Sequence, residues 1–67
     1  MRYLKFTDLA GKGVIFTRRH VARLVAEGRF PRPVKLAPDG RAIAWPEPEI
    51  DAYMAARLEE RDRSVAA

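Results

Sequence analysis

Apolar and polar residues follow two different periods along this chain, and the first patterned stretch is short. A mostly apolar lead-in at 3–6 precedes Thr7, a residue suited to cap the N-terminus of a first helix. Gly11 and Gly13 predict the end of that helix and a tight turn. The apolar residues at 14–16 are then expected to run back into the core.

A second helix is predicted over 17–28. Val21, Leu24 and Val25 recur at the i, i+3, i+4 spacing that produces one buried stripe. The segment opens on threonine, a favoured N-cap, and closes on glycine, which adopts the left-handed C-terminal conformation at least cost. With the first helix and the turn before it, this segment predicts a helix-turn-helix.

The side of the second helix opposite the apolar stripe is positively charged. At about 100° per residue, Arg19 and Arg23 project from it, with Ala22 and Ala26 beside them. Small side chains leave the backbone free to approach another surface closely. Arg18 lies nearer the helix N-terminus. A cationic helix beside a cationic loop fits a DNA groove and its flanking phosphates.

The apolar period changes to two after this helix. The two prolines within 30–33 block helix continuation and force extended backbone. Alternating apolar residues flank the turn sequence Pro-Asp-Gly at 38–40, which predicts a two-stranded wing over 34–45. Trp45 shares the phase of Ile43, so we expect it to be a core residue that packs on the last helix.

A third helix is expected after Pro46, with acidic residues in its first turn that compensate the helix dipole. After Glu59 the only periodic apolar residue is Val65, which predicts one domain over 1–62 and a frayed C-terminal tail over 63–67. The apolar stripe of this helix consists of Ile50, Tyr53, Met54 and Leu58.

Composition limits the chain to one small domain. The 67 residues are 48% hydrophobic and can bury a single core. Together with the elements predicted above, this gives a fold class that is mainly α with a small β-hairpin. Without cysteine and with one histidine, the chain is expected to hold neither a disulfide nor a metal. No apolar run approaches the roughly 18 residues of a membrane span, so we expect a cytoplasmic protein without a membrane partner.

Charge is divided unevenly along the chain, whose net charge is +4. Residues 2–41 hold ten Lys and Arg against three Asp and Glu, a net +7. Residues 42–67 hold three Arg against six Asp and Glu, a net −3. Charges of alternating sign would serve only to solvate the surface, but this segregation predicts that the first part faces a polyanion.

Catalysis finds no support in the sequence. General acid–base chemistry needs positioned partners, and His20 has no cysteine or serine near it. The glycines around Lys12 do not form the phosphate-cradling G-x-x-x-x-G-K-[ST] pattern. We therefore expect a protein that is not an enzyme and needs no cofactor.

A resemblance to the AlpA family of prophage and mobile-element regulators and excisionases covers about residues 3–60. Its most specific part is Glu-Gly-Arg-Phe-Pro-Arg-Pro-Val-Lys-Leu, followed by Trp and by Glu-Ile-Asp-Ala-Tyr. This sequence departs from the family pattern in the link Gly-Lys-Gly-Val-Ile-Phe and in the prolines at 46 and 48. The resemblance implies a MerR-like winged helix-turn-helix of three helices and a two-stranded wing.

The resemblance also implies that the second helix enters the DNA major groove and that wing 34–45 lies along the backbone or the minor groove. Arg32 is added to the candidate contacts because, like Arg29, it flanks the proline turn. The DNA-contact role that the resemblance implies falls on Thr17, Arg18, Arg19, His20 and Arg23 in the helix and on Lys35 and Arg41 in the wing.

Each candidate contact has a structural alternative. Arg19 and Arg23 are expected to contact bases or phosphates, although exposed helical arginines often only solvate a surface. Arg18 is expected to meet a phosphate. His20 would bond a phosphate or serve as a core-edge residue, and Thr17 caps the helix in either case. The wing cations would contact DNA, or would only aid solubility and shield an edge strand.

The sequence thus predicts a sequence-specific DNA-binding protein of a prophage or integrative element. It would act as an excisionase (recombination directionality factor), as a transcriptional regulator, or as both, with double-stranded DNA as its partner. An integrase or RNA polymerase is a candidate protein partner. Because one small module buries modest surface, several copies are expected on adjacent sites. The alternative is a phage-encoded protein-interaction module whose positively charged side binds an acidic host protein.

Overall fold

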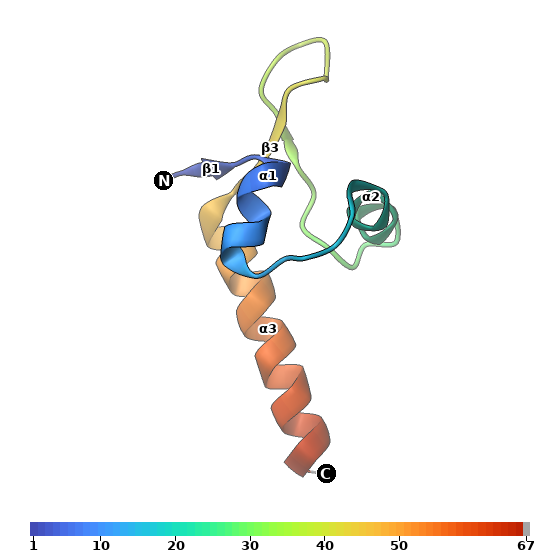
Figure 1. Cartoon of the computed structure of the whole chain (residues 1–67), viewed down its shortest axis with the longest axis vertical. Coiled ribbons are helices and arrows are strands. Elements are labelled where there is room, and N and C mark those ends of the chain that lie inside the picture. The colour runs from blue at the N-terminus through green and yellow to red at the C-terminus, as the bar shows by residue number, and fades with distance from the viewer. Residues whose placement is uncertain (67) are drawn as a thin grey trace.

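The structure is a computed structural model that describes residues 1–66, with a mainly helical chain and a small sheet. This confirms the expected class of a mainly α protein with a β-hairpin and adds a third strand to it. In chain order the elements are β1 (Tyr3–Leu4), α1 (Phe6–Leu9), the 3-10 turn η1 (Ala10–Lys12), α2 (Arg18–Ala26), β2 (Val34–Lys35), β3 (Ile43–Pro46) and α3 (Glu47–Ala66) (Figure 1).

The sheet is antiparallel, with β3 between β1 and β2. Leu4 of β1 lies opposite Trp45, and Val34 of β2 lies opposite Ala44. The β2–β3 pair is the hairpin that the two-residue period predicted. The sequence treated β1 only as a lead-in, because two residues are too few to show an alternation.

Trp45 lies at the centre of the core and is only 3% exposed, which confirms its expected structural place. Its ring centroid lies 5.9 Å from that of Phe30, edge to face, and its Nε1 donates to the backbone carbonyl of Pro31 at 2.7 Å. The indole therefore fixes the proline turn against β3 and leaves its own N–H satisfied. The buried core cluster consists of Leu4, Leu9, Val14, Val21, Phe30, Trp45 and Ile50.

The first helix begins earlier than the sequence indicated, and the expected Thr7 cap is wrong. Lys5 is the N-cap residue, and its backbone N–H donates to Asp8 Oδ2 at 2.9 Å. The backbone N–H of Asp8 donates in turn to the carbonyl of Lys5 at 2.9 Å, so this amide is satisfied without a hydroxyl cap, and Thr7 falls inside the helix.

Of the apolar run at 14–16, only Val14 enters the core. Gly13 has φ +93°, and the amide of Val14 donates to the carbonyl of Leu9 at 3.0 Å, so the chain reverses there. Ile15 is 85% exposed. The prediction that the whole run is buried is therefore wrong, because the link must cross open surface to reach α2.

The last helix follows β3 without a loop, and its C-terminal half projects from the rest of the molecule (Figure 1). Pro48 lies in its first turn, where a missing backbone N–H costs little. Helical backbone continues through 63–66, which the sequence assigned to a frayed tail; Ala67 lies outside the described residues. Residues with good helix propensity and the Arg57–Glu60 ion pair extend the helix beyond its apolar stripe. The domain limit at 62 stays a prediction.

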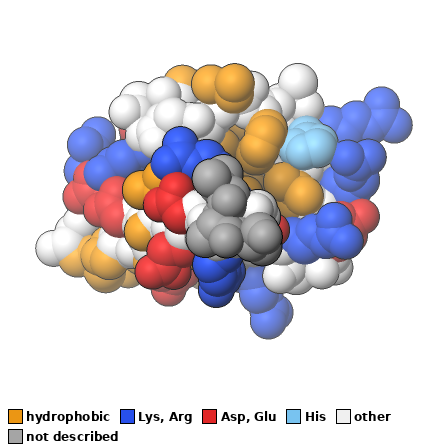
Figure 2. Space-filling view, turned by 90° about the horizontal axis from the view of Figure 1, so that it is seen from below, with side chains coloured by type: hydrophobic (Ala, Val, Ile, Leu, Met, Phe, Trp, Pro, Cys, Tyr) orange, Lys and Arg blue, Asp and Glu red, His pale blue; other side chains and the backbone are white. Residues whose placement is uncertain are grey.

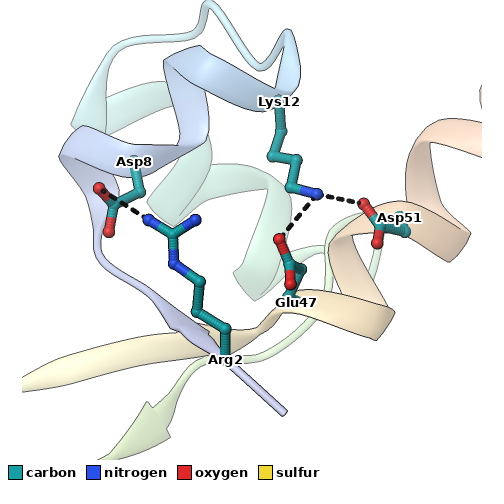
Figure 3. A network of polar contacts seen from close by, with 5 residues as sticks. All are labelled: Arg2, Asp8, Lys12, Glu47 and Asp51. Carbon is teal, nitrogen blue, oxygen red and sulfur yellow. Dashed lines mark hydrogen bonds and ion pairs between the residues drawn. The ribbon is translucent and has the colours of Figure 1, made fainter.

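An ion-pair cluster ties the first helical segment to the start of α3 (Figure 3). Lys12 Nζ lies 2.9 Å from Glu47 Oε2 and 2.9 Å from Asp51 Oδ1. The hydrogen bond to Glu47, then the one to Asp51, raises the pKa of Lys12 above 10.5. These two carboxylates compensate the charge of Lys12, so it contributes little to a DNA-facing surface.

Replacing Lys12 by Met should lower the melting temperature at neutral pH, because Glu47 and Asp51 lose their shared partner. The raised pKa means that this stabilisation is fully present below pH 10.5 and is lost as pH rises through the higher folded-state pKa. Thermal melts of both proteins across this range measure the difference. Lys35→Met is the matched control at an exposed lysine, and an equal effect of the two substitutions would refute the role of the cluster.

Candidate nucleic-acid interface

Local sequence determines how α2 is formed. Thr17 is its N-cap, and the Thr17 Oγ1 accepts the backbone N–H of His20 at 3.1 Å, which confirms the predicted cap. At the other end Gly28 has φ +74°, the left-handed conformation expected there. Val21 is buried and Leu24 is partly buried, so the predicted apolar stripe faces the core. This orientation leaves the opposite side of α2 to solvent.

That opposite side is a cationic surface, here called the basic face and defined by Thr17, Arg19, His20 and Arg23. These four residues line a depression of about 410 Å³. Figure 2 shows Lys and Arg side chains gathered around the chain's single histidine at one edge of the molecule. Among the described residues, no carboxylate forms an ion pair with either arginine. The basic face is therefore open to an external anion.

His20 lies between an aromatic ring and an arginine. Its ring centroid is 4.6 Å from that of Phe16, and its Nδ1 is 3.1 Å from Arg23 Nη2. Because a guanidinium only donates, Nδ1 is the acceptor of this bond. The imidazole thus orients Arg23 from a half-buried position.

Arg18 points in a different direction from the basic face. Its guanidinium carbon lies 4.5 Å from the centroid of the Phe6 ring, over the first turn of α1. A cation over an aromatic face is attracted by the ring quadrupole, so Phe6 restricts the arginine. The structure therefore divides the α2 arginines into two groups.

The hairpin turn forms as its sequence predicted. The amide of Gly40 donates to the carbonyl of Ala37 at 3.0 Å, and Gly40 has φ +74°. Asp39 Oδ1 accepts the amide of Arg41 at 3.0 Å, which rigidifies the base of the turn. Arg41 and Lys35 are both exposed on this hairpin.

A second cationic site lies between α2 and the hairpin, in a space here called the hairpin groove. Its lining includes Lys5, Arg18 and Arg41, together with apolar residues of α2, of β3 and of the loop segments beside the strands, and its volume is about 600 Å³. Sequence reasoning missed Lys5, because no local signal shows that the start of α1 lies beside the hairpin. Arg32 and Lys35 line neither the hairpin groove nor the basic face, and both are exposed.

Within residues 1–66, no three His, Asp or Glu side chains are grouped to hold a metal ion. The same part of the chain has no helix with the length and hydropathy of a membrane span. The basic face and the hairpin groove both consist of cationic side chains, and the hairpin groove has apolar surface beside them.

Comparison with known proteins gives one match. No curated protein and no solved structure is significantly similar to this chain. The family described as prophage CP4-57 regulatory protein (AlpA) matches residues 2–58. This span includes every element from β1 into the middle of α3 and most of the 67-residue chain. The chain therefore belongs to the AlpA family of prophage regulatory proteins.

Proposed function

We propose that this chain is a sequence-specific DNA-binding protein of a prophage or integrative element, with a MerR-like winged helix-turn-helix fold. Membership of a prophage regulator family supports a regulatory role. The observation that carries the proposal is the basic face, whose two arginines have no carboxylate partner among the described residues. Uncompensated cations on an exposed helix favour a polyanionic partner.

In this proposal α2 enters the major groove. An α-helix with its side chains is about 10–12 Å across, which suits a major groove about 12 Å wide. Arg19 and Arg23 would contact base edges, while Thr17 and the N-terminal amides of α2 would lie against a phosphate. His20 would hold Arg23 in place.

The β2–β3 hairpin would act as the wing. Arg41 and Lys35 would contact the adjacent backbone or the minor groove, and Arg32 would reach a phosphate beside the proline turn. Arg18, restrained over Phe6, would also meet a phosphate. These contacts would add affinity but little sequence information.

The biological role would be that of an excisionase, a transcriptional regulator, or both, in the cytoplasm. Several copies on adjacent sites would give the specificity that one small module lacks. As an excisionase the protein would assist an integrase, and as a regulator it would act on RNA polymerase. Excision of the element by its integrase, measured with and without this protein, distinguishes the two, since a pure regulator leaves the reaction unchanged in purified components.

DNA affinity should fall steeply with salt. If Lys35 and Arg41 contact the backbone, as proposed for Arg18 and Arg32, four cations engage phosphates, and log K should decrease with log salt at a slope of about −3.6. Fluorescence anisotropy with a labelled duplex, across a range of salt concentrations, measures this slope. Arg41→Gln should reduce it by about 0.9. A flat response in the unmodified protein would reject DNA binding.

A further inference from the structure

The hairpin groove has an apolar floor that no segment of residues 1–66 covers. Leu36 is 53% exposed and Ile43 is 40% exposed, and both line the groove opposite Val25 of α2. The phase of β3 predicted Ile43 to share the buried face of Trp45, but the hairpin leaves the body at this point and exposes Ile43. A volume of about 600 Å³ is within the range of sites for small molecules.

The groove stays open because small residues occupy the positions that could have filled it. Ala22 of α2, Ala42 before β3 and Pro33 all line the space. Larger side chains there would close the hairpin onto α2. The surface that remains in the groove is partly apolar and accessible to a ligand.

The groove is also positively charged, and no acidic side chain that the structure describes in its lining compensates this charge. Lys5, Arg18 and Arg41 line it, and no aspartate or glutamate is among the described lining residues. No ion pair within residues 1–66 involves any of these three cations. Phe6 holds the Arg18 guanidinium at 4.5 Å, so at least one cation has a restricted position.

We propose that the hairpin groove binds an amphiphilic anion, a small molecule with a flat or aliphatic apolar body and one carboxylate or sulfonate group. The body would cover Leu36, Ile43 and Val25, and the anionic group would pair with Arg18 or Arg41. A guanidinium accepts such a group through two parallel hydrogen bonds. This site is additional to the proposed DNA-binding function and does not depend on it.

A DNA strand fits this groove less well. Its phosphates would satisfy the cations, but a hydrated phosphodiester leaves the apolar floor without a partner. An amphiphilic anion satisfies both features. If Arg18 and Arg41 also contact DNA, as proposed above, the bound anion and the duplex would compete, and this one consequence rests on the proposed function.

The test uses the full chain and the fluorescent probe 8-anilinonaphthalene-1-sulfonate. Binding should saturate at one probe per chain and should be at least about fivefold tighter than for the neutral analogue N-phenyl-1-naphthylamine. Arg18→Gln and Arg41→Gln should each weaken it by about fivefold. Arg63→Gln, a matched change on the distal part of α3, should leave it unchanged.

A second variant, Ala22→Phe, places a ring in the groove from an exposed position of α2. It should abolish probe binding while circular dichroism and melting temperature stay near those of the unmodified protein. Binding that does not saturate, that is equal for both probes, or that survives Arg18→Gln and Ala22→Phe would overturn the proposal.

Adding duplex DNA to the probe complex tests the ligand site and the proposed DNA-binding function separately. Displacement of the probe by the duplex supports competition at the shared arginines. Retention of the probe while DNA binds refutes competition but supports a separate anion site. A protein that binds the probe in the groove and binds no DNA would contradict the proposed function and leave the ligand site standing.

Discussion

Replacing Trp45 by alanine should lower the melting temperature by roughly 15–30 °C, because losing a buried tryptophan costs about 3–5 kcal/mol. A domain of this size has only about 3–10 kcal/mol of stability, so part of the population should be unfolded at room temperature. The substitution removes the packing against Phe30 and leaves the carbonyl of Pro31 without its donor. Far-UV circular dichroism melts measure the effect.

One further variant separates the packing of the Trp45 ring from its hydrogen bond, and a second serves as a control. Trp45→Phe keeps an aromatic ring but lacks the N–H, so its loss should be intermediate, about 1–3 kcal/mol. Leu58→Ala removes a 52% exposed apolar side chain on α3 and should change the melting temperature little. A Trp45→Ala protein that melts within a few degrees of the unmodified one would contradict the structure of the core.

Arg23→Ala should weaken binding to the preferred DNA site by about 5- to 150-fold, which corresponds to about 1–3 kcal/mol, and should flatten sequence preference. The expectation rests on the place of Arg23 in the basic face, where His20 Nδ1 holds its guanidinium at 3.1 Å. Arg18→Ala should weaken all sequences similarly, because Arg18 lies over Phe6 and is assigned to a phosphate. Binding to a library of duplexes measures affinity and preference together.

Arg63→Ala is the control for the removal of a positive charge, since Arg63 lies on the projecting half of α3. It should change neither affinity nor preference beyond a small electrostatic effect. Identical preference profiles for Arg23→Ala and Arg18→Ala would show that the two arginines have no separate roles.

The sequence by itself determined the features that short-range chemistry decides. The Thr17 cap, the glycine after α2 and the Ala37–Gly40 turn depend on residues at most four positions apart, and the structure forms each as predicted. The apolar stripe of α2 follows from one helical period, and its opposite side is positively charged whichever way the helix packs. The division of charge along the chain also follows from the sequence alone, and it indicated a polyanionic partner.

Local sequence did not decide where the first helix begins or which of residues 14–16 are buried. Both Thr7 and Asp8 could satisfy the helix start, and the observed choice depends on the contact from Asp8 to the amide of Lys5. Ile15 has the hydropathy of a core residue, but the path from Gly13 to α2 keeps it in solvent. Hydropathy predicts which residues can be buried and does not predict which of them the chain path allows.

Tertiary structure alone decided which charges act together. Lys12 belongs by sequence to the positive part of the chain, yet Glu47 and Asp51 of α3 compensate it. Lys5, Arg18 and Arg41 come from three separate segments of the chain and meet at the hairpin groove only in the folded structure. Such groupings depend on distances between segments far apart in the chain, and no period or spacing within one segment contains that information.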